Sequence, residues 1–132
     1  TLTGTGTVTV TAASKSDQET GTSTTTAVTP SVAKSSDSAA KAWVLFPAAG
    51  GITASYGVTS VTKNSTGNYT IAWSTAFSTA NYTVICMPFA GAGLLLASST
   101  VSILAGSVTM QNIQSGVGVV DAITSCEAYG RQ

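Results

Sequence analysis

Hydrophobic and polar residues alternate over several short segments of this 132-residue chain. Alternation with a period of two predicts β-strands that bury one face. We expect strands in TLTGTGTVTVTA at the N-terminus, AWVLF (42–46), NYTVICMPF (81–89), LLLASSTVSI, SVTMQNI and VGVVDAITSCEAYG. In residues 81–89 apolar side chains occupy both faces, with Ile85 and Met87 opposite Val84 and Cys86. That pattern predicts a strand buried on both sides.

The clearest local signal is a hairpin, in which ITASYGVTSVT and NYTIAWST flank the turn sequence KNSTG. Its second strand places Tyr69, Ile71 and Trp73 on one face. Seven or eight short strands separated by turn residues predict an all-β fold, a jelly-roll-like β-sandwich. We expect one short helix, beginning at Thr29-Pro30, because Thr is a common N-cap and Pro fits the first helical position.

Residues 13–27 are rich in hydroxyls and charges, which is typical of a solvated linker or an extended segment. We therefore divide the chain into an N-terminal strand and connector, residues 1–40, and a β-sandwich, residues 41–132. The connector has few large apolar residues, so it cannot form a core of its own.

The composition of the chain limits the classes of molecule that it could bind. Five basic residues balance five acidic ones and only 8% of residues are charged, so no strong field attracts nucleic acid or anionic lipid. The apolar run 93–106 is too short and too rich in hydroxyls for a membrane span. No charged residue lies between Lys63 and Asp121. Two interpretations of this uncharged span stay open: much of its surface faces other copies of the chain, or the surface is rich in hydroxyls and soluble without charge.

Candidate chemistry is sparse. The chain has no histidine, which excludes Ser-His-Asp catalysis and most zinc sites. Asp121 and Glu127 would lie roughly 20 Å apart along one strand, too far for a glycosidase pair, and we expect no catalysis and no cofactor. For Cys86 and Cys126 we expect buried free thiols, with a single disulfide as the alternative. Most aromatic residues are expected in the core, and Phe89, ahead of Gly91, is the best candidate for exposure.

The segment ASKSDQETGTSTTTAVTPSV resembles a connector of bacteriophage tail fibres and related virion appendages. The resemblance is carried by an ExGxxxxxxVTP core, here Glu19, Gly21, Val28, Thr29 and Pro30. The following SAAKAWVLF and ITASYGVTSVTKNSTGNYTIAWSTAFSTANYTV are similar to the fibre domain that often follows this connector. The similarity covers residues 12–86. The chain departs from the pattern in FPAAGG after the first strand and in Cys126 and Glu127 near its end.

The resemblance implies a homotrimeric virion protein, a tail fibre or spike subunit, in which the connector docks the sandwich on a stalk. It implies contact with other virion proteins and with a bacterial surface glycan or protein, a location on the virion exterior, and assembly in the host cytoplasm. We place receptor contacts on loops 47–51, 63–68 and 88–93, with Pro47, Asn64, Asn68 and Phe89 as candidate residues. The alternative is a head fibre or capsid decoration protein with a purely structural role.

Overall fold

The computed structural model of the chain describes residues 10–89 and 95–132. The chain divides into two compact units, Thr1–Ser36 and Asp37–Gln132. In the described part, the first unit holds two short helices and the second holds nine strands. Their bounds are α1 Lys15–Thr20, α2 Pro30–Ala33, β1 Ala40–Phe46, β2 Ala54–Tyr56, β3 Val58–Ser65, β4 Asn68–Trp73, β5 Thr83–Pro88, β6 Leu96–Leu104, β7 Ser107–Gln114, β8 Gly118–Val119 and β9 Thr124–Tyr129.

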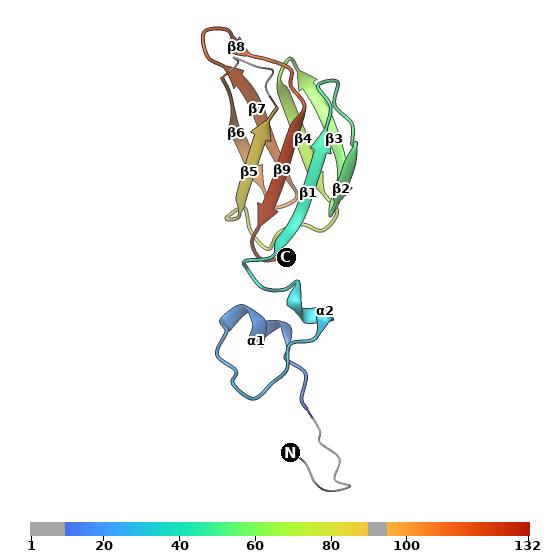
Figure 1. The fold of residues 1–132 in the computed structure, drawn as a ribbon, viewed down its shortest axis with the longest axis vertical. Coiled ribbons are helices and arrows are strands. Elements are labelled where there is room, and N and C mark those ends of the chain that lie inside the picture. Colours follow the sequence, from blue (N-terminus) through green and yellow to red (C-terminus); the bar gives the residue numbers. More distant parts are fainter. Residues whose placement is uncertain (1–9, 90–94) are drawn as a thin grey trace, which may run out of the picture. The chain divides into compact units, whose positions relative to one another are not determined.

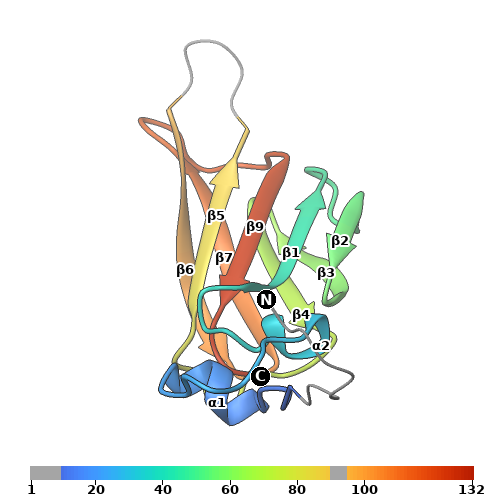
Figure 2. The same ribbon diagram turned by 60° about the horizontal axis from the view of Figure 1, so that its bottom comes forward.

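The second unit is a sandwich of two antiparallel sheets (Figure 1). One sheet has the strand order β2-β1-β9-β5, which Figure 2 shows side by side. The other has the order β3-β4-β7-β6, with the short β8 paired to β7. The predicted all-β sandwich is confirmed, as is the hairpin formed by β3 and β4 around Thr66 and Gly67.

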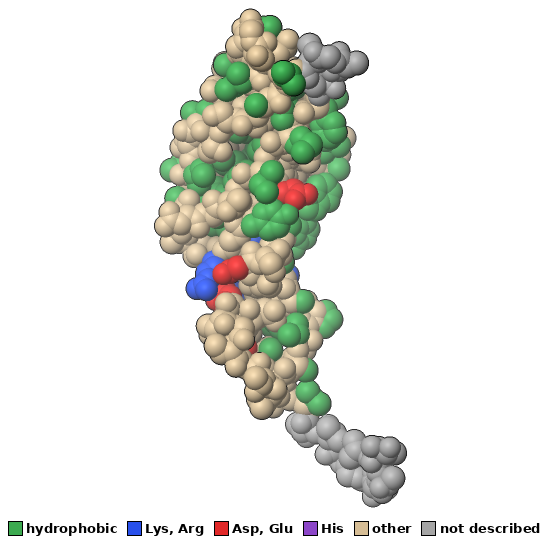
Figure 3. Space-filling model, turned by 60° about the vertical axis from the view of Figure 1, so that its left-hand side comes forward, with side chains coloured by type: hydrophobic (Ala, Val, Ile, Leu, Met, Phe, Trp, Pro, Cys, Tyr) green, Lys and Arg blue, Asp and Glu red, His purple; other side chains and the backbone are tan. Residues whose placement is uncertain are grey.

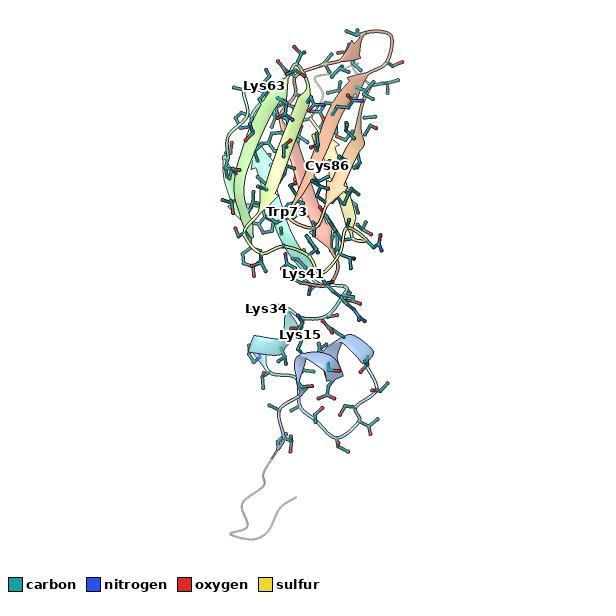
Figure 4. All side chains as sticks on the ribbon, turned by 180° about the vertical axis from the view of Figure 1, so that it is seen from behind. Lys15, Lys34, Lys41, Lys63, Trp73 and Cys86 are labelled. Carbon is teal, nitrogen blue, oxygen red and sulfur yellow. A yellow bond between two sulfur atoms is a disulfide. The ribbon has the colours of Figure 1, made fainter. Side chains whose placement is uncertain are left out.

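The core lies between the sheets and is built from alternate residues of the central strands. On β4 the predicted face of Tyr69, Ile71 and Trp73 is confirmed as buried. Trp73 lies inside the sandwich (Figure 4) and its indole Nε1 donates to the Tyr82 hydroxyl at 2.9 Å. The Tyr82 hydroxyl in turn donates toward the Leu104 and Ser107 carbonyls, both at 2.9 Å. Both buried polar groups therefore have partners, as the cost of an unpaired polar group in a core requires. The other core side chains are Ala42, Val44, Phe46, Val61, Phe77, Val108, Met110, Cys126 and Ala128.

The strand predicted in residues 81–89 exists as β5, but the prediction that both of its faces are buried is wrong. β5 is at the edge of its sheet and pairs with β9 alone. Val84 and Cys86 pack against the core, whereas Ile85 and Met87 are 57% and 65% exposed. No third layer covers this sheet in the described sandwich, so apolar residues on its outer face meet solvent.

The connector departs from prediction in one place. Residues 15–20, expected to belong to a solvated linker or an extended segment, form α1. Ser14 and Asp17 cap this helix reciprocally, with the Asp17 N–H donating to Ser14 Oγ at 3.1 Å and the Ser14 N–H donating to Asp17 Oδ2 at 2.8 Å. The predicted helix start at Thr29-Pro30 is confirmed as α2. Of the N-terminal strand, residues 1–9 lie outside the described part, and the remainder makes an isolated bridge between Ala12 and Ala27.

The expectation of free thiols is also wrong, because Cys86 and Cys126 form a disulfide. These two residues lie directly opposite each other on the neighbouring strands β5 and β9. Both side chains point toward the core, so the strand pairing itself brings the sulfur atoms together. The sequence alone could not reveal this register.

Candidate binding surface

The outward face of the sheet β2-β1-β9-β5, hereafter the apolar face, is the most distinctive surface of the sandwich. Strand register arranges its side chains in rows. The first row runs Tyr56, Trp43, Glu127, Ile85, and the second runs Ala54, Leu45, Ser125, Met87. A third begins with Phe89, whose N–H donates to the Ile123 carbonyl at 2.8 Å. Figure 3 shows hydrophobic side chains gathered on the sandwich, with acidic atoms among them.

The exposed side chains of the apolar face form two groups, which differ in chemical type and in position on the sheet. The aromatic half holds Trp43 and Tyr56, which are 40% and 52% exposed, together with Glu127. The aliphatic half holds the exposed side chains of Ile85, Met87 and Ile123, on or beside the edge strand β5, and includes one aromatic ring, that of Phe89. Scattered single apolar residues are normal on a protein surface, but a contiguous group of them marks a contact site.

The outward face of the second sheet is different and serves as an internal comparison. One of its rows is Thr62, Thr70, Thr109, Ser102, and another holds Asn68, Gln111 and Ser99. These side chains bond among themselves, as when the Thr70 and Thr109 hydroxyls approach to 3.0 Å. The central rows of this second face are thus polar, although Val101 and Leu104 on its edge strand β6 are 52% and 61% exposed. The apolar face differs in carrying two exposed aromatic rings, Trp43 and Tyr56, on neighbouring strands.

Glu127 is the acidic residue of the apolar face. It lies directly opposite Trp43 on one side and Ile85 on the other. Its Oε2 accepts a 2.6 Å hydrogen bond from the Tyr129 hydroxyl, two residues along β9. This bond to the carboxylate raises the pKa of Tyr129, so the phenol keeps its proton and holds the carboxylate in place.

A hollow of about 510 Å³ adjoins the aromatic half. Tyr129 and Thr83, which line it, are opposite each other in the row next to Glu127 and Ile85. Asn81, Asp37 and Arg131 also line it, and Arg131 Nε donates to Asp37 Oδ2 at 3.3 Å. The hollow therefore offers both hydrogen-bond donors and hydrogen-bond acceptors, and its two formal charges, on Asp37 and Arg131, are paired with each other.

The other acidic residue considered as a catalytic partner, Asp121, serves the hairpin end of the sandwich. It accepts from Lys63 Nζ at 2.5 Å, from the Gly67 N–H at 2.6 Å and from the Tyr69 hydroxyl at 3.2 Å. The Lys63 hydrogen bond and then the Gly67 N–H lower the pKa of the Asp121 carboxyl. Asp121 precedes β9 while Glu127 is within it, and each has its own partners. The structure does not bring these two carboxylates together as a pair.

The predicted receptor-contact residues lie at one end of the sandwich, where β1 and β5 end and β3 turns into β4 (Figure 1). Asn64 Nδ2 donates to Asn68 Oδ1 at 2.8 Å, so these two amides bond to each other. Pro47 is half-buried and its carbonyl closes a turn with Gly50. Phe89 is 56% exposed and belongs to the aliphatic half. Most of loop 88–93 lies outside the described residues, and a role of these loops in binding stays a prediction.

The connector residues that carry the resemblance have local structural roles. Gly21 ends α1 in the left-handed conformation, with φ of 63°, which favours glycine. Glu19 lies 3.8 Å from Lys15 one turn earlier. Thr29 and Pro30 begin α2, and Val28 is 57% exposed. Docking of this segment on other chains stays a prediction.

Sequence reasoning missed the aromatic half, because core packing is the role it predicts for Trp43 and Tyr56. The signal was present in the strand period. Trp43 alternates with Ala42 and Val44, so a strand with those two residues inside must place Trp43 outside. Glu127 and Tyr129 alternate with Cys126 and Ala128 in the same way.

Comparison of the chain with protein-family models, with curated proteins and with solved structures found no match. Within residues 10–89 and 95–132, no three His, Cys, Asp or Glu side chains gather in a group that could hold a metal ion. In the same ranges, no helix has both the length and the apolar character to cross a membrane.

Proposed function

We propose that this chain is a subunit of a bacteriophage tail fibre or spike, that it forms a homotrimer, and that its sandwich attaches the virion to the bacterial surface. The proposal is supported by the similarity of residues 12–86 to the fibre connector and domain. The observation that carries it is the apolar face, on which exposed aromatic and aliphatic side chains lie beside one another on neighbouring strands. A sheet that exposes adjacent aromatic and aliphatic side chains on its outer face is suited to contact through that face.

Within this proposal the two halves have separate roles. Ile85, Met87 and Phe89 lie on or beside an edge strand, and their side chains carry no charge, hydroxyl or amide. Such a surface suits contact between protein chains, whose interface cores are depleted in charge. We assign the aliphatic half to association between copies and leave the aromatic half, with its carboxylate, for attachment.

The disulfide supports a location on the virion exterior. Disulfides persist in oxidising surroundings and are rare in the cytosol, where thiols are kept reduced. A subunit assembled in the host cytoplasm would therefore form the Cys86–Cys126 bond after release of the virion. The mature fibre would be the oxidised form.

The first test is the native mass of the purified protein by light scattering. A trimer has a mass of 3 × 13.1 kDa, near 39 kDa. Met87→Asp, which places a charge in the aliphatic half, should shift the mass toward that of one chain. The matched control is Val101→Asp, because Val101 is similarly exposed, at 52%, on β6 of the other sheet. A wild-type monomer, or equal effects of the two substitutions, would contradict the assignment.

The second test is adhesion. Fluorescently labelled protein is mixed with a panel of Gram-negative and Gram-positive cells and with intact phage particles. Saturable binding to the cells of some strains supports attachment. Binding to particles and to no strain would instead favour a head fibre or decoration protein.

A further inference from the structure

We infer that the aromatic half of the apolar face is a saccharide-binding site, in which Trp43 and Tyr56 form a stacking platform and Glu127 accepts hydrogen bonds from sugar hydroxyls. This inference rests on the proposed attachment function and names the class of ligand.

The platform follows from strand register. Trp43 and Tyr56 are directly opposite each other on β1 and β2, so their Cβ atoms lie about 4.5–5.5 Å apart. Both side chains remain substantially exposed. A sugar ring presents a face of C–H groups, and those groups carry the partial positive charge that the negative face of an aromatic ring attracts. Aliphatic side chains such as Ile85 offer no such attraction.

The polar contacts stand beside the platform. Glu127 is opposite Trp43 on the side away from Tyr56, and its carboxylate can accept from two neighbouring hydroxyls. The Tyr129 hydroxyl donates to Glu127 Oε2 at 2.6 Å, which leaves the other carboxylate oxygen for a ligand. Hydrogen bonds to a charged acceptor are the stronger kind. A sugar ring over Trp43 would have its rim at this carboxylate.

Charge selects among saccharides. Of the nearby cations, Lys41 is buried and Arg131 donates to Asp37. Glu127 therefore gives the face a negative character, which disfavours uronates and phosphorylated sugars and favours neutral ones. An oligosaccharide that runs past Tyr129 reaches the hollow, where Asn81, Asp37 and Arg131 can bind further hydroxyls.

One such site is open to water, so we expect weak binding by each copy. Three copies on one fibre would raise the overall affinity without tightening any single site. This is consistent with a platform that is exposed rather than enclosed.

The test begins with the 132-residue chain on an array of immobilised neutral oligosaccharides, with glucuronate-containing oligosaccharides as the charged comparison. We expect binding to some neutral members, and weaker binding when glucuronate replaces the neutral sugar. Trp43→Ala should lower affinity about tenfold or more, the loss expected for a stacking ring, and Trp43→Phe should retain part of it. Glu127→Ala should also lower it. Val101→Ala, on the other sheet, should change nothing, and thermal unfolding of each variant verifies its fold.

Fluorescence then locates the site. Of the two tryptophans, Trp73 is 6% exposed and Trp43 is 40% exposed, so acrylamide quenches mainly Trp43. A bound oligosaccharide should protect the wild-type protein from quenching. Binding without protection would place the ligand elsewhere and overturn the inference. So would a Trp43 that acrylamide cannot reach in the assembled protein.

The outcomes of the saccharide-binding and cell-adhesion experiments separate this inference from the proposed function. Adhesion to cells that persists in Trp43→Ala, with no saccharide bound by the wild-type protein, would overturn the saccharide site and leave attachment standing, through a protein partner. Saccharide binding that depends on Trp43, with no adhesion to any bacterial strain, would support the site and contradict attachment. Equal binding of glucuronate-containing oligosaccharides would refute the role given to Glu127.

Discussion

Removal of the Cys86–Cys126 disulfide should strongly destabilise the sandwich. The bond joins β5, an edge strand, to β9, which lies next to it in the sheet. β5 has β9 as its hydrogen-bonding partner within the sheet, and the bond closes a chain segment that contains β6, β7 and β8. The perturbation is either reduction of the wild-type protein or the double substitution Cys86→Ala and Cys126→Ala.

The size of the effect follows from the 40 residues that separate the two cysteines. In the chain-entropy treatment, a cross-link lowers the entropy of the unfolded chain by about 2.1 + 1.5R ln n cal/mol/K, where n is the loop length. For a loop of this length the result is about 13 cal/mol/K, or about 4 kcal/mol at room temperature. That is a large share of the ~5–15 kcal/mol that stabilises an ordinary domain.

Urea unfolding with and without reductant measures the difference. We expect a loss of about 4 kcal/mol in the free energy of unfolding, equivalent to a fall of roughly 20 °C in Tm for a domain of this size. Reduction keeps both sulfur atoms, whereas the double alanine variant also removes the buried Cys126 sulfur, so the variant should be slightly the less stable form. Its stability should not respond to reductant. A loss below about 1 kcal/mol on reduction would refute the loop-entropy argument.

Three further predictions concern the hairpin end. Lys63 and the Gly67 N–H lower the pKa of the Asp121 carboxyl. The carboxylate's contribution to stability is therefore present above the unfolded pKa of about 3.9 and is lost as pH falls through the lower folded pKa. Urea unfolding across acid pH measures this loss, and Asp121→Asn should make stability depend less on pH. Burial, followed by the Asp121 charge, raises the pKa of Tyr69 to about 12. The contribution of Tyr69 to stability is therefore present below a pH of about 10 and is lost as pH rises toward 12. Tyrosinate absorbance and urea unfolding at alkaline pH can follow this loss, with Tyr69→Phe as the control. Gly67→Ala should lower the free energy of unfolding in urea by about 2 kcal/mol or more, because φ is 61° and a Cβ would overlap a neighbouring backbone carbonyl. Gly116→Ala is the control, because φ is 76° but the space around it is open, and it should cost only about 1 kcal/mol for the backbone conformation. Equal losses would show that the overlap has no effect.

The sandwich could be predicted because its signals are local. The period of two in residues 69–73 fixes which side chains share a face, and the KNSTG turn fixes the hairpin whatever the rest of the chain does. The α1 helix was also within reach, since Ser14, Asp17 and Gly21 are the residues of a capping box and a C-cap. The hydroxyl-rich composition of the segment obscured that signal.

The disulfide and the candidate site could not be predicted in the same way, because both depend on which strands become neighbours. Cys86 meets Cys126 only after β5 pairs with β9 in one register, and Glu127 meets Trp43 only after β9 pairs with β1. These pairings join residues far apart in the sequence. No local pattern specifies them.

The error at β5 is informative about function. Apolar residues on both faces of a strand predict burial on both sides when stability alone is considered, because exposed Ile85 and Met87 gain nothing for the isolated fold. The central strands of the second sheet carry threonine and other polar side chains on their outer face, so this chain can cover a sheet with polar groups. Places where a sequence departs from the pattern that its fold requires are expected at functional sites. The unburied face of β5 is therefore the part of the predicted pattern that points to a partner, and the same reasoning applies to Trp43 two strands away.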